Sequence, residues 1–371
     1  MKYRKFGNLG FEVSALGFGT MRFPLTPGST GDADVDEQQA IDMMRKAIDG
    51  GVNYIDTAYI YHSGNSEKVI AKALRDGYRE KVRLADKSPV WMIKSPDDFD
   101  RLLKTQLERL ETEYIDLYML HSITRDSWQD ILRFGLLEKM EQKKAQGVIG
   151  HIGFSFHDDY DVFVKTLDGY DKWEYCMLQM NYAGLEHQAT LKGLQLAASR
   201  GLGIIVMEPL LGGKLVNLPP AAAAELSGEK SPAEWALDYL WGLPEVGVVV
   251  SGMSSEEQVA QNLEYAARSS VGMLSDSEIA MLMRVAEKYR DNTLIPCTEC
   301  GYCLPCPAGI RIPSILEAYN RRFTLGFEHA LNKYQESQVS AKECTACGEC
   351  EQNCPQHIKV SELMPMIGSK F

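Results

Sequence analysis

The chain has 371 residues, of which 45% are hydrophobic and 24% charged, and its formal net charge is −12 at pH 7. This length predicts one large domain with a smaller one, or two domains, and the acidic balance without a basic run argues against nucleic acid as a partner. No segment reaches the uninterrupted apolar length of a membrane span, and Met1–Phe6 lacks the apolar part of a secretory signal, so we expect a cytoplasmic protein with no membrane partner.

Segment 1–14 alternates around Gly7 and Gly10, which predicts a small hairpin that closes the base of the next domain. Eight apolar segments then alternate with eight helical patterns, as in a (β/α)8 barrel, also called a TIM barrel. The expected strands are 15–19, 52–56, 82–87, 115–120, 148–154, 175–180, 203–207 and 246–250. The expected helices are 36–49, 66–76, 97–110, 127–146, 158–168, 187–200, 231–241 and 255–267. A doubly wound sheet is the alternative, but Gly17-Phe18-Gly19 lacks the third glycine of a phosphate loop.

Three of the predicted strands end in, or are followed at once by, a polar side chain. Asp56 ends one strand, Lys87 ends the next, and His121 follows the third. Parallel strands bring their carboxyl ends to one mouth of a barrel, so we expect these side chains to meet Tyr61, which lies in the loop after Asp56. A single residue of this kind is more often a satisfied core polar group, but the four together favour a catalytic site.

The motif Asp56-Thr57-Ala58-x-x-Tyr61, followed by Gly64-Asn65-Ser66-Glu67, resembles the aldo-keto reductase signature. Lys87 and His121 occupy the two other positions of that family's tetrad. The resemblance covers roughly residues 1–270. It implies an NAD(P)-dependent oxidoreductase that interconverts a carbonyl, in an aldehyde, ketone or sugar, and an alcohol.

Carbonyl reduction needs a hydride at carbon and a proton at oxygen. Tyrosine is a weak acid, with a reference pKa of about 10, and a neighbouring ammonium favours its phenolate form. Lys87 would supply this charge, Asp56 would hold Lys87, and His121 would orient the substrate oxygen. Tyr61 is therefore the predicted proton donor, and Tyr59 is the rival.

The resemblance also implies a nicotinamide nucleotide, either NADP or NAD. Phosphate commonly binds to the loops after barrel strands seven and eight, which are 207–214 and 251–255 here. Their glycines allow close backbone approach, and the helix that starts near Ser255 favours an anion, although ordinary turn chemistry also explains the glycines. The implied nucleotide contacts are Gly19, Thr20, Met21, Ser155, Gln179, Pro209, Leu210, Gly212, Lys214, Gly252, Met253, Ser254, Gln258, Gln261 and Asn262.

Four positions depart from the family pattern. Met207 stands where an aromatic residue is frequent, Glu208 where a small hydroxyl residue is usual, and Asp86 where threonine is usual. The region of Ser254 carries no arginine for the 2′-phosphate of NADP, which leaves NAD and NADP open. A second carboxylate at Asp86, next to Lys87, is expected to change the influence of the Lys87 charge on Tyr61.

After a helix expected at 276–290 and a linker at 291–296, the chain carries eight of its nine cysteines in two runs. The runs are Cys297, Cys300, Cys303 and Cys306, and then Cys344, Cys347, Cys350 and Cys354, each followed by proline. The second run matches the bacterial [4Fe–4S] pattern, in which the fourth cysteine ligates the other cluster, and the first run is one residue shorter. We therefore predict two [4Fe–4S] clusters. Zinc is the alternative, but structural zinc sites usually present paired Cys-x-x-Cys units and not triplets. The ninth cysteine, Cys176, is expected in the core.

Between the runs, apolar residues recur at helical spacing in 312–319 and 327–334, which resembles the all-helical ferredoxins. The predicted domains are a barrel at 1–292 and a small all-helical ferredoxin-type iron–sulfur domain at 293–371. The expected substrate is a small-molecule carbonyl or alcohol. The expected redox partner of the clusters is a ferredoxin or a flavoprotein. Trp91 and Trp128, beside the third and fourth strands, are candidates to line the substrate pocket or to pack in the core.

A hydride carries two electrons, whereas one cluster accepts one, so direct exchange between them is awkward. Three functions stay open. The clusters could link an oxidoreductase to a redox partner, or they could be structural or sense oxygen in an ordinary reductase. The third possible function is a redox-sensing cofactor-binding module without significant turnover. The pairing of Tyr61 with Lys87 argues against this function. The substrate and the oligomeric state stay open.

Overall fold

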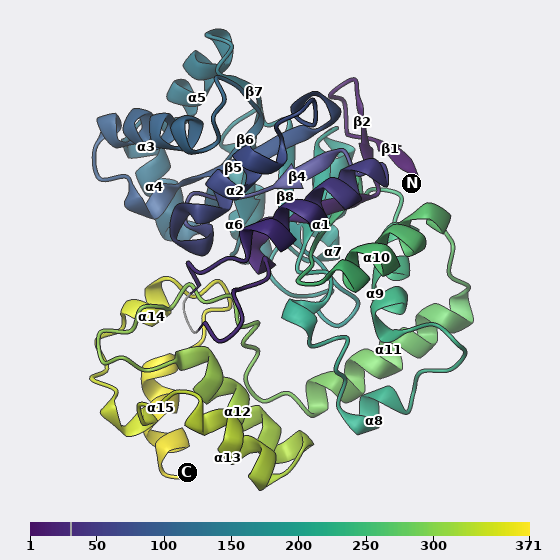
Figure 1. Cartoon of the computed structure of the whole chain (residues 1–371), viewed down its shortest axis with the longest axis vertical. Coiled ribbons are helices and arrows are strands. Elements are labelled where there is room, and N and C mark those ends of the chain that lie inside the picture. Colours follow the sequence, from purple (N-terminus) through teal and green to yellow (C-terminus); the bar gives the residue numbers. More distant parts are fainter. Residues whose placement is uncertain (30–31) are drawn as a thin grey trace. The chain divides into compact units, whose positions relative to one another are not determined.

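The structure, a computed structural model, describes residues 1–29 and 32–371 and divides into two compact units (Figure 1). The first contains Met1–Pro209 and Leu237–Leu274, and the second contains Leu210–Ala236 and Ser275–Phe371. The second unit therefore draws on two separated parts of the chain. Within the described ranges, no helix is both long enough and apolar enough to cross a membrane.

Eight parallel strands of the first unit close into a barrel, because β10 pairs with both β9 and β3. The strands are β3 (Leu16–Gly19), β4 (Tyr54–Asp56), β5 (Arg83–Pro89), β6 (Ile115–Ile123), β7 (Ile149–Phe156), β8 (Tyr175–Gln179), β9 (Gly203–Met207) and β10 (Val248–Gly252). The predicted (β/α)8 barrel is confirmed, and a doubly wound sheet is excluded because an open sheet has no such closing pair.

A short antiparallel hairpin, β1 (Tyr3–Lys5) with β2 (Glu12–Ser14), precedes the barrel. Phe6, which follows β1, is fully buried among the inward side chains of the strands. The Asn8 amide donates to the Gly201 carbonyl, just before β9, at 2.9 Å. The hairpin thus lies at the amino ends of the strands, as its sequence pattern predicted, and leaves the carboxyl ends to the loops.

The helices of the barrel follow the strands, and several start at a side-chain cap such as Ser255, which accepts a hydrogen bond from the Gln258 amide. They are α1 (Glu37–Asp49), α2 (Asn65–Ala73), α3 (Pro96–Arg109), α4 (Arg125–Arg133), α5 (Leu136–Ala145), α6 (Tyr160–Asp168), α7 (Thr190–Ser199), α9 (Pro232–Gly242) and α10 (Glu256–Arg268). The single helix predicted at 127–146 is wrong, since α4 and α5 are separated at Gly135. That glycine has a φ of +62°, a left-handed conformation that a residue without Cβ adopts readily.

The second unit is helical, as predicted for the C-terminal part of the chain. Its helices are α8 (Pro220–Ala223), α11 (Asp276–Asp291), α12 (Ile312–Thr324), α13 (Phe327–Gln335), α14 (Glu349–Gln352) and α15 (Val360–Gly368), of which α8, α14 and α15 were not predicted. The α12 residues Ile315 and Leu316 share one buried core with Met364 and Ile367 of α15. Five of the eight clustered cysteines pack against this core without being fully buried.

Helix α11 packs within the second unit, against the segment that contains α8. Arg284 of α11 donates to the Glu225 carboxylate at 3.1 Å, and the Ser227 hydroxyl lies 3.2 Å from the sulfur of Met281. The division into compact units therefore differs from the boundary predicted after residue 292, because α11 and segment 210–236 pack against each other in the second unit.

Candidate active site and cysteine sites

Asp56 and Lys87 form a buried ion pair at the carboxyl ends of β4 and β5. Lys87 Nζ lies 2.6 Å from Asp56 Oδ2 and donates a second hydrogen bond to the Thr57 carbonyl, also at 2.6 Å. Only 1% of the Lys87 side chain is exposed. Burial raises the pKa of Asp56, and the Lys87 charge opposes that rise. Two of the three ammonium protons are thereby committed, which fixes where the amine can lie.

Tyr61 and His121 complete a cluster of four side chains. Tyr61 begins the 3-10 helix Tyr61–Gly64, and Lys87 Nζ lies 4.9 Å from the centroid of its ring. The Tyr61 and His121 rings are 6.3 Å apart and nearly perpendicular, with an interplanar angle of 86°. The structure thus brings together the four residues named from the sequence, and their catalytic roles stay a prediction.

His121 is suited to donate a single hydrogen bond as a neutral imidazole. Burial, followed by the charge of Lys87 and the neighbouring His157, holds the pKa of His121 well below its usual range. The half-buried Trp91 lies beside it, with ring centroids 5.0 Å apart. Trp128, in contrast, is 8% exposed and packs against Gly169, where an added Cβ would lie 2.5 Å from its ring. Trp91 therefore lies beside the tetrad, whereas Trp128 belongs to the core.

The rival proton donor, Tyr59, is held on the side of α3. The Arg109 guanidinium lies 4.4 Å from the Tyr59 ring centroid and donates to the Tyr59 carbonyl at 3.1 Å. Arg109 also pairs with the fully buried Glu67 carboxylate at 2.8 Å. The ring with a lysine amine beside it is that of Tyr61, as the family spacing implied.

Asp86 is buried on the opposite face of β5 from Lys87, as alternation along a strand requires. Its Oδ1 accepts from the Lys87 amide at 2.8 Å, and the Glu67 carboxyl is a neighbouring charge. Asp86 Oδ2 and Glu67 Oε1 are buried acceptors with no donor, an unfavourable arrangement for two carboxylates. We therefore expect the pair to hold one proton. Burial, and then the Glu67 charge, raises the pKa of Asp86 well above its usual range.

We expect Asp86→Asn to stabilise the barrel increasingly as the pH rises above about 4, the ordinary pKa of aspartate. A carboxyl whose pKa is raised by folding stabilises the fold most below its unfolded pKa, and this contribution is lost as the pH rises through the folded pKa. Asparagine keeps an acceptor for the Lys87 amide and a donor for Glu67 but does not titrate. Urea unfolding followed by tryptophan fluorescence should show the wild type losing up to about 1.4 kcal/mol per pH unit relative to the variant.

The exposed Asp97, in the first turn of α3, offers a matched control, since Asp97→Asn should leave the pH dependence of unfolding unchanged. Unfolding curves of wild type and Asp86→Asn that stay parallel from pH 4 to pH 8 would show that no proton is shared between Asp86 and Glu67.

Several residues implied for nucleotide binding lie at the same end of the barrel as Asp56. Gly19 and Gly252 are register partners at the ends of β3 and β10, and the Thr20 hydroxyl donates to the Asp56 carbonyl at 2.9 Å. Ser155, near the end of β7, is buried and accepts from the Ser122 amide at 2.7 Å. These contacts place polar groups around the tetrad.

The other implied contacts have different surroundings. Gln179 ends β8 and is 4% exposed, and Pro209 is also buried. Met21 is half-buried in the 3-10 helix Thr20–Arg22. Met253 is fully buried and has no exposed surface that could contact a nucleotide. Gln258 Oε1 accepts from the Ser254 amide at 2.8 Å, Asn262 donates to Ser251 Oγ at 3.1 Å, and the exposed Gln261 donates to Glu257. Gln258 and Asn262 therefore shape the loop after β10.

Arg22 was missed by the sequence reasoning. The Ser254 hydroxyl donates to the Arg22 carbonyl at 2.7 Å, and a Cβ added at Gly252 would lie 2.8 Å from Arg22 Cγ. The loop after β10 therefore has an arginine against it, although none lies near Ser254 in the sequence. The signal was available, because barrel closure makes the residue after β3 a neighbour of the loop after β10.

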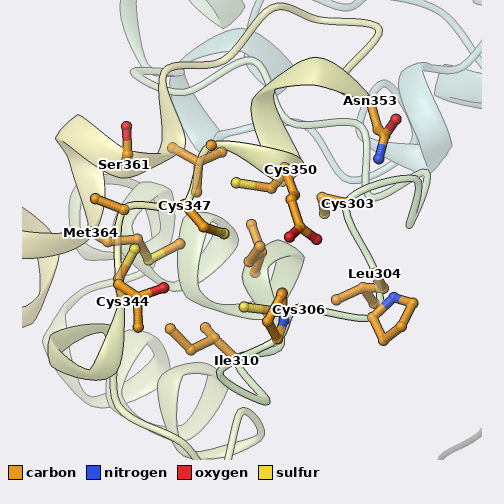
Figure 2. Close-up of a pocket in the computed structure, with 18 of the residues that line it drawn as sticks. Cys303, Leu304, Cys306, Ile310, Cys344, Cys347, Cys350, Asn353, Ser361 and Met364 are labelled. Carbon is orange, nitrogen blue, oxygen red and sulfur yellow. The ribbon is translucent and has the colours of Figure 1, made fainter.

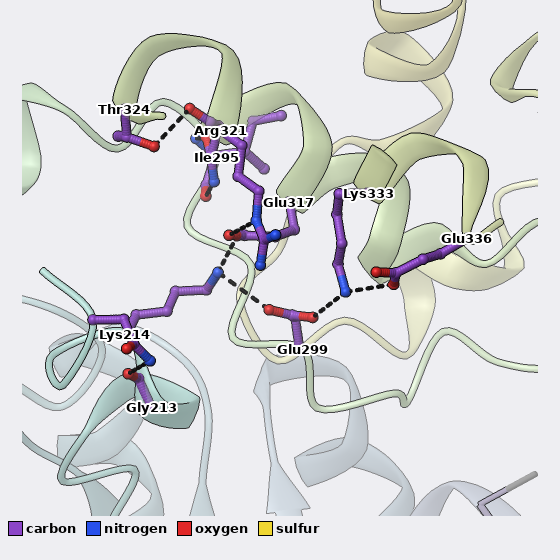
Figure 3. A network of polar contacts seen from close by, with 11 residues as sticks. Gly213, Lys214, Ile295, Glu299, Glu317, Arg321, Thr324, Lys333 and Glu336 are labelled. Atoms are coloured by element: carbon purple, nitrogen blue, oxygen red, sulfur yellow. Dashed lines mark hydrogen bonds and ion pairs between the residues drawn. The ribbon is translucent and has the colours of Figure 1, made fainter. Parts of the chain in front are cut away.

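Lys214 was expected to contact the nucleotide, but the structure places it in the second unit, together with Leu210 and Gly212. Figure 3 shows its amine between two carboxylates: it pairs with Glu317 of α12 and lies 3.4 Å from Glu299. Lys333 of α13 lies 4.0 Å from the other oxygen of Glu299. The charge of Lys214 is thus engaged by residues around the first cysteine run.

Cysteines of both runs surround one cavity in the second unit. The cavity has a volume of about 240 Å³, and Cys344, Cys347 and Cys350 line it together with Cys303 and Cys306 of the first run. Figure 2 shows these thiols around the space that Ile310 and Met364 also border. Cys306 thus lies with three cysteines of the second run, as the spacing predicted, but Cys303 lines the same cavity, and the division of the thiols between two clusters stays a prediction.

Cys303 also lies near three thiols that do not line this cavity. Burial, followed by the neighbouring Cys300, Cys297 and Cys354, raises the pKa of the Cys303 thiol. Within the described part of the chain, no three cysteine, histidine or acidic groups lie close enough for a single metal ion. Thiols spread around a cavity fit a polynuclear group such as a cubane better than one zinc ion, whose ligands lie near 2.3 Å from the metal.

Comparison with known proteins agrees with both sites. The model of the aldo/keto reductase family matches residues 15–287, and that of the 4Fe-4S dicluster domain matches residues 296–359. The uncharacterized oxidoreductase YrpG of Bacillus subtilis is 33% identical over 239 residues, which are 58% of this chain and 68% of that protein.

Two further proteins are similar to the barrel region. The NADH-specific methylglyoxal reductase of Escherichia coli is 28% identical over 58% of this chain and 70% of its own length. The solved holo form of an aldo-keto reductase from Bacillus halodurans has a TM-score of 0.64 at 27% identity, and the match covers 77% of this chain and 96% of that one.

Proposed function

Because the chain belongs to the aldo/keto reductase family and carries a C-terminal 4Fe-4S dicluster domain, we propose that it is an NAD(P)-dependent oxidoreductase that interconverts a small carbonyl compound and its alcohol. The observation that carries this proposal is the convergence of Lys87, Tyr61 and His121 at the barrel mouth, with Asp56 holding the amine. The third candidate, a sensor without turnover, needs no amine beside a phenol.

Each tetrad residue has one task in this proposal. Tyr61 gives its proton to the substrate oxygen, and Lys87 stabilises the phenolate that remains, as a charge next to it does. His121, held neutral by burial, donates a hydrogen bond that orients the same oxygen. Asp56 keeps the Lys87 ammonium at this position. The bound nicotinamide nucleotide would supply the hydride.

The nucleotide would lie at the carboxyl ends of the strands. Gly19 and Gly252 would allow close backbone approach, Ser155 and Gln179 would hold the carboxamide, and Arg22, beside the loop after β10, would offer a positive charge to a phosphate. A relative in Escherichia coli is named NADH-specific, but Arg22 provides the kind of charge that a 2′-phosphate needs. Both nucleotides therefore belong in the test.

The dicluster domain would hold two [4Fe–4S] clusters in this proposal. Cys344, Cys347, Cys350 and Cys306 would hold one, and Cys297, Cys300, Cys303 and Cys354 the other. The chemistry that such clusters supply is one-electron transfer, which points to a ferredoxin or a flavoprotein as the redox partner. Structural or oxygen-sensing clusters are the second candidate, because a hydride donor and a one-electron carrier do not exchange electrons directly.

Anaerobic turnover of a panel of sugars, ketones and aldehydes with NADH and with NADPH tests the proposal. We expect nucleotide oxidation that depends on at least one carbonyl compound, and we expect bleaching of the cluster absorbance with reduced ferredoxin but little with nucleotide alone. Absence of nucleotide binding, or binding without turnover of any carbonyl or alcohol, would refute the reductase. Turnover without bleaching by any partner would leave the clusters a structural role.

A further inference from the structure

His62, the residue after Tyr61, is a buried histidine whose two ring nitrogens both face carbonyl oxygens. Its side chain is 3% exposed. Nδ1 lies 2.8 Å from the Asp32 carbonyl oxygen, and Nε2 lies 3.0 Å from the Thr20 carbonyl oxygen. The Phe23 ring stacks on the imidazole at 5.6 Å between centroids. The ring is therefore held from both edges and from one face.

Carbonyl oxygens only accept hydrogen bonds, and this determines the form of the ring. A neutral imidazole has one nitrogen that donates and one that accepts, so it would set a nitrogen lone pair against a carbonyl lone pair at one edge. The imidazolium donates from both nitrogens. A counter-charge is present, because Asp32 Oδ1 lies 3.3 Å from His62 Nδ1. In the described part of the chain, the other groups shown to contact the ring, from Thr20 and Phe23, are neutral.

These hydrogen bonds also hold an uncommon backbone next to Tyr61. His62 and Ser63 have φ values of +51° and +56°, in the left-handed region that residues with a Cβ rarely occupy. Thr20, which accepts from His62, donates through its hydroxyl to the Asp56 carbonyl at 2.9 Å. The charged ring therefore links the turn that carries Tyr61 to the strand end that carries Asp56.

We infer that His62 is held as an imidazolium and is a positioning residue for Tyr61, so that loss of its proton at alkaline pH loosens the turn at 61–64. The effect on turnover rests on the proposed function of Tyr61, whereas the charge state of His62 and the order of the turn do not.

The electrostatics agree with this arrangement. Burial acts to lower the pKa of His62, but the hydrogen bonds and the charge of Asp32, with the Thr20 carbonyl, outweigh it and raise the pKa above its usual value. A raised histidine pKa stabilises the fold fully below the unfolded value near 6.5. That contribution is lost as the pH rises through the folded pKa, so the loosening belongs to the alkaline side.

Nitrogen NMR of the wild-type chain with ¹⁵N-labelled histidine tests the charge state without any variant. We expect one of the seven histidines to show two protonated ring nitrogens at pH 7.5, and we expect His62→Gln to remove that signal. A single protonated nitrogen on His62 at this pH, in either tautomer, would overturn the inference.

Amide hydrogen exchange and kinetics test the positioning role. In His62→Gln, peptides that cover 57–66 should exchange faster than in the wild type at the same pH, and kcat should fall about 10- to 100-fold with little change in KM for the nucleotide. Asp32→Asn, at an exposed position, should keep the fold and move the alkaline decline of kcat to lower pH. His329→Gln, in the exposed face of α13, is the matched control and should change none of these.

The outcomes separate this inference from the proposed function. If no carbonyl is turned over, the NMR signal and the exchange of 57–66 still decide the state and the role of His62. Unchanged exchange and an unchanged pH profile in His62→Gln, in a chain that does turn over substrate, would overturn the positioning role while leaving the reductase in place.

Discussion

Replacing Tyr61 by phenylalanine is expected to lower kcat for carbonyl reduction by about 10²- to 10⁴-fold, the usual contribution of a positioned proton donor. The ring remains, so its contacts with Lys87 and His121 persist, and only the hydroxyl is lost. The affinity for the nucleotide should not change. Stopped-flow measurement of nucleotide oxidation, with nucleotide binding measured separately by fluorescence, distinguishes these effects.

Tyr59→Phe provides the control for this experiment. The Tyr59 ring faces the Arg109 guanidinium, and its carbonyl accepts from the same side chain, so loss of the hydroxyl leaves both contacts intact. We expect nearly wild-type turnover. The assignment of the proton donor would be wrong if Tyr61→Phe kept full turnover, and Tyr59 would replace it if Tyr59→Phe showed the loss instead.

Replacing the fourth cysteine of either run should remove one cluster and leave the other. Because the proposal pairs the fourth cysteine of each run with the first three of the opposite run, Cys306→Ser should remove the cluster from the cavity lined by Cys344, Cys347 and Cys350. Cys354→Ser should affect the group around Cys303. In each variant, the iron content should fall from about eight to about four atoms per chain, and the sulfide content should fall by the same amount.

The measurement that checks this is iron and sulfide analysis of anaerobically purified protein, together with low-temperature EPR of the reduced form. Cys176→Ala is the control, because Cys176 is a buried barrel residue apart from both groups and should leave the iron content unchanged. Metal binding contributes folding free energy, so each variant should also make the second unit more sensitive to protease. Zinc in place of iron and sulfide would contradict the prediction.

The sequence alone was sufficient for the barrel and for the convergence of the four tetrad side chains, whereas the division of the cysteines between two clusters stays a prediction. Periodicity reports which face of an element is buried, and parallel strands put their ends at one mouth, so polar residues at strand ends were expected to meet. Asp56, Lys87 and His121 end or follow buried segments, and this is why their convergence was predictable. Cysteine spacing carries similar information, because the length of each loop limits which thiols can share a site.

The misplaced helix boundary and the missed helix α15 have local causes. A left-handed glycine at 135 interrupts a pattern whose apolar spacing is otherwise continuous, so α4 and α5 were read as one helix. The helix Val360–Gly368 contains Pro365, which lowers the expectation of a helix at that point in the sequence. Packing of Met364 and Ile367 against α12 outweighs that local cost.

Only the tertiary structure showed how the charges are partnered. The proton expected on the Asp86–Glu67 pair, the placement of Lys214 between Glu299 and Glu317, and the imidazolium inferred at His62 all depend on groups that are distant in the sequence. The identity of a side chain determines what charge it can carry, and its position in the sequence pattern indicates which face of a helix or strand it occupies. Its protonation depends on the donors and acceptors within about 3 Å of it and on the loss of water around them, which only the folded chain brings together.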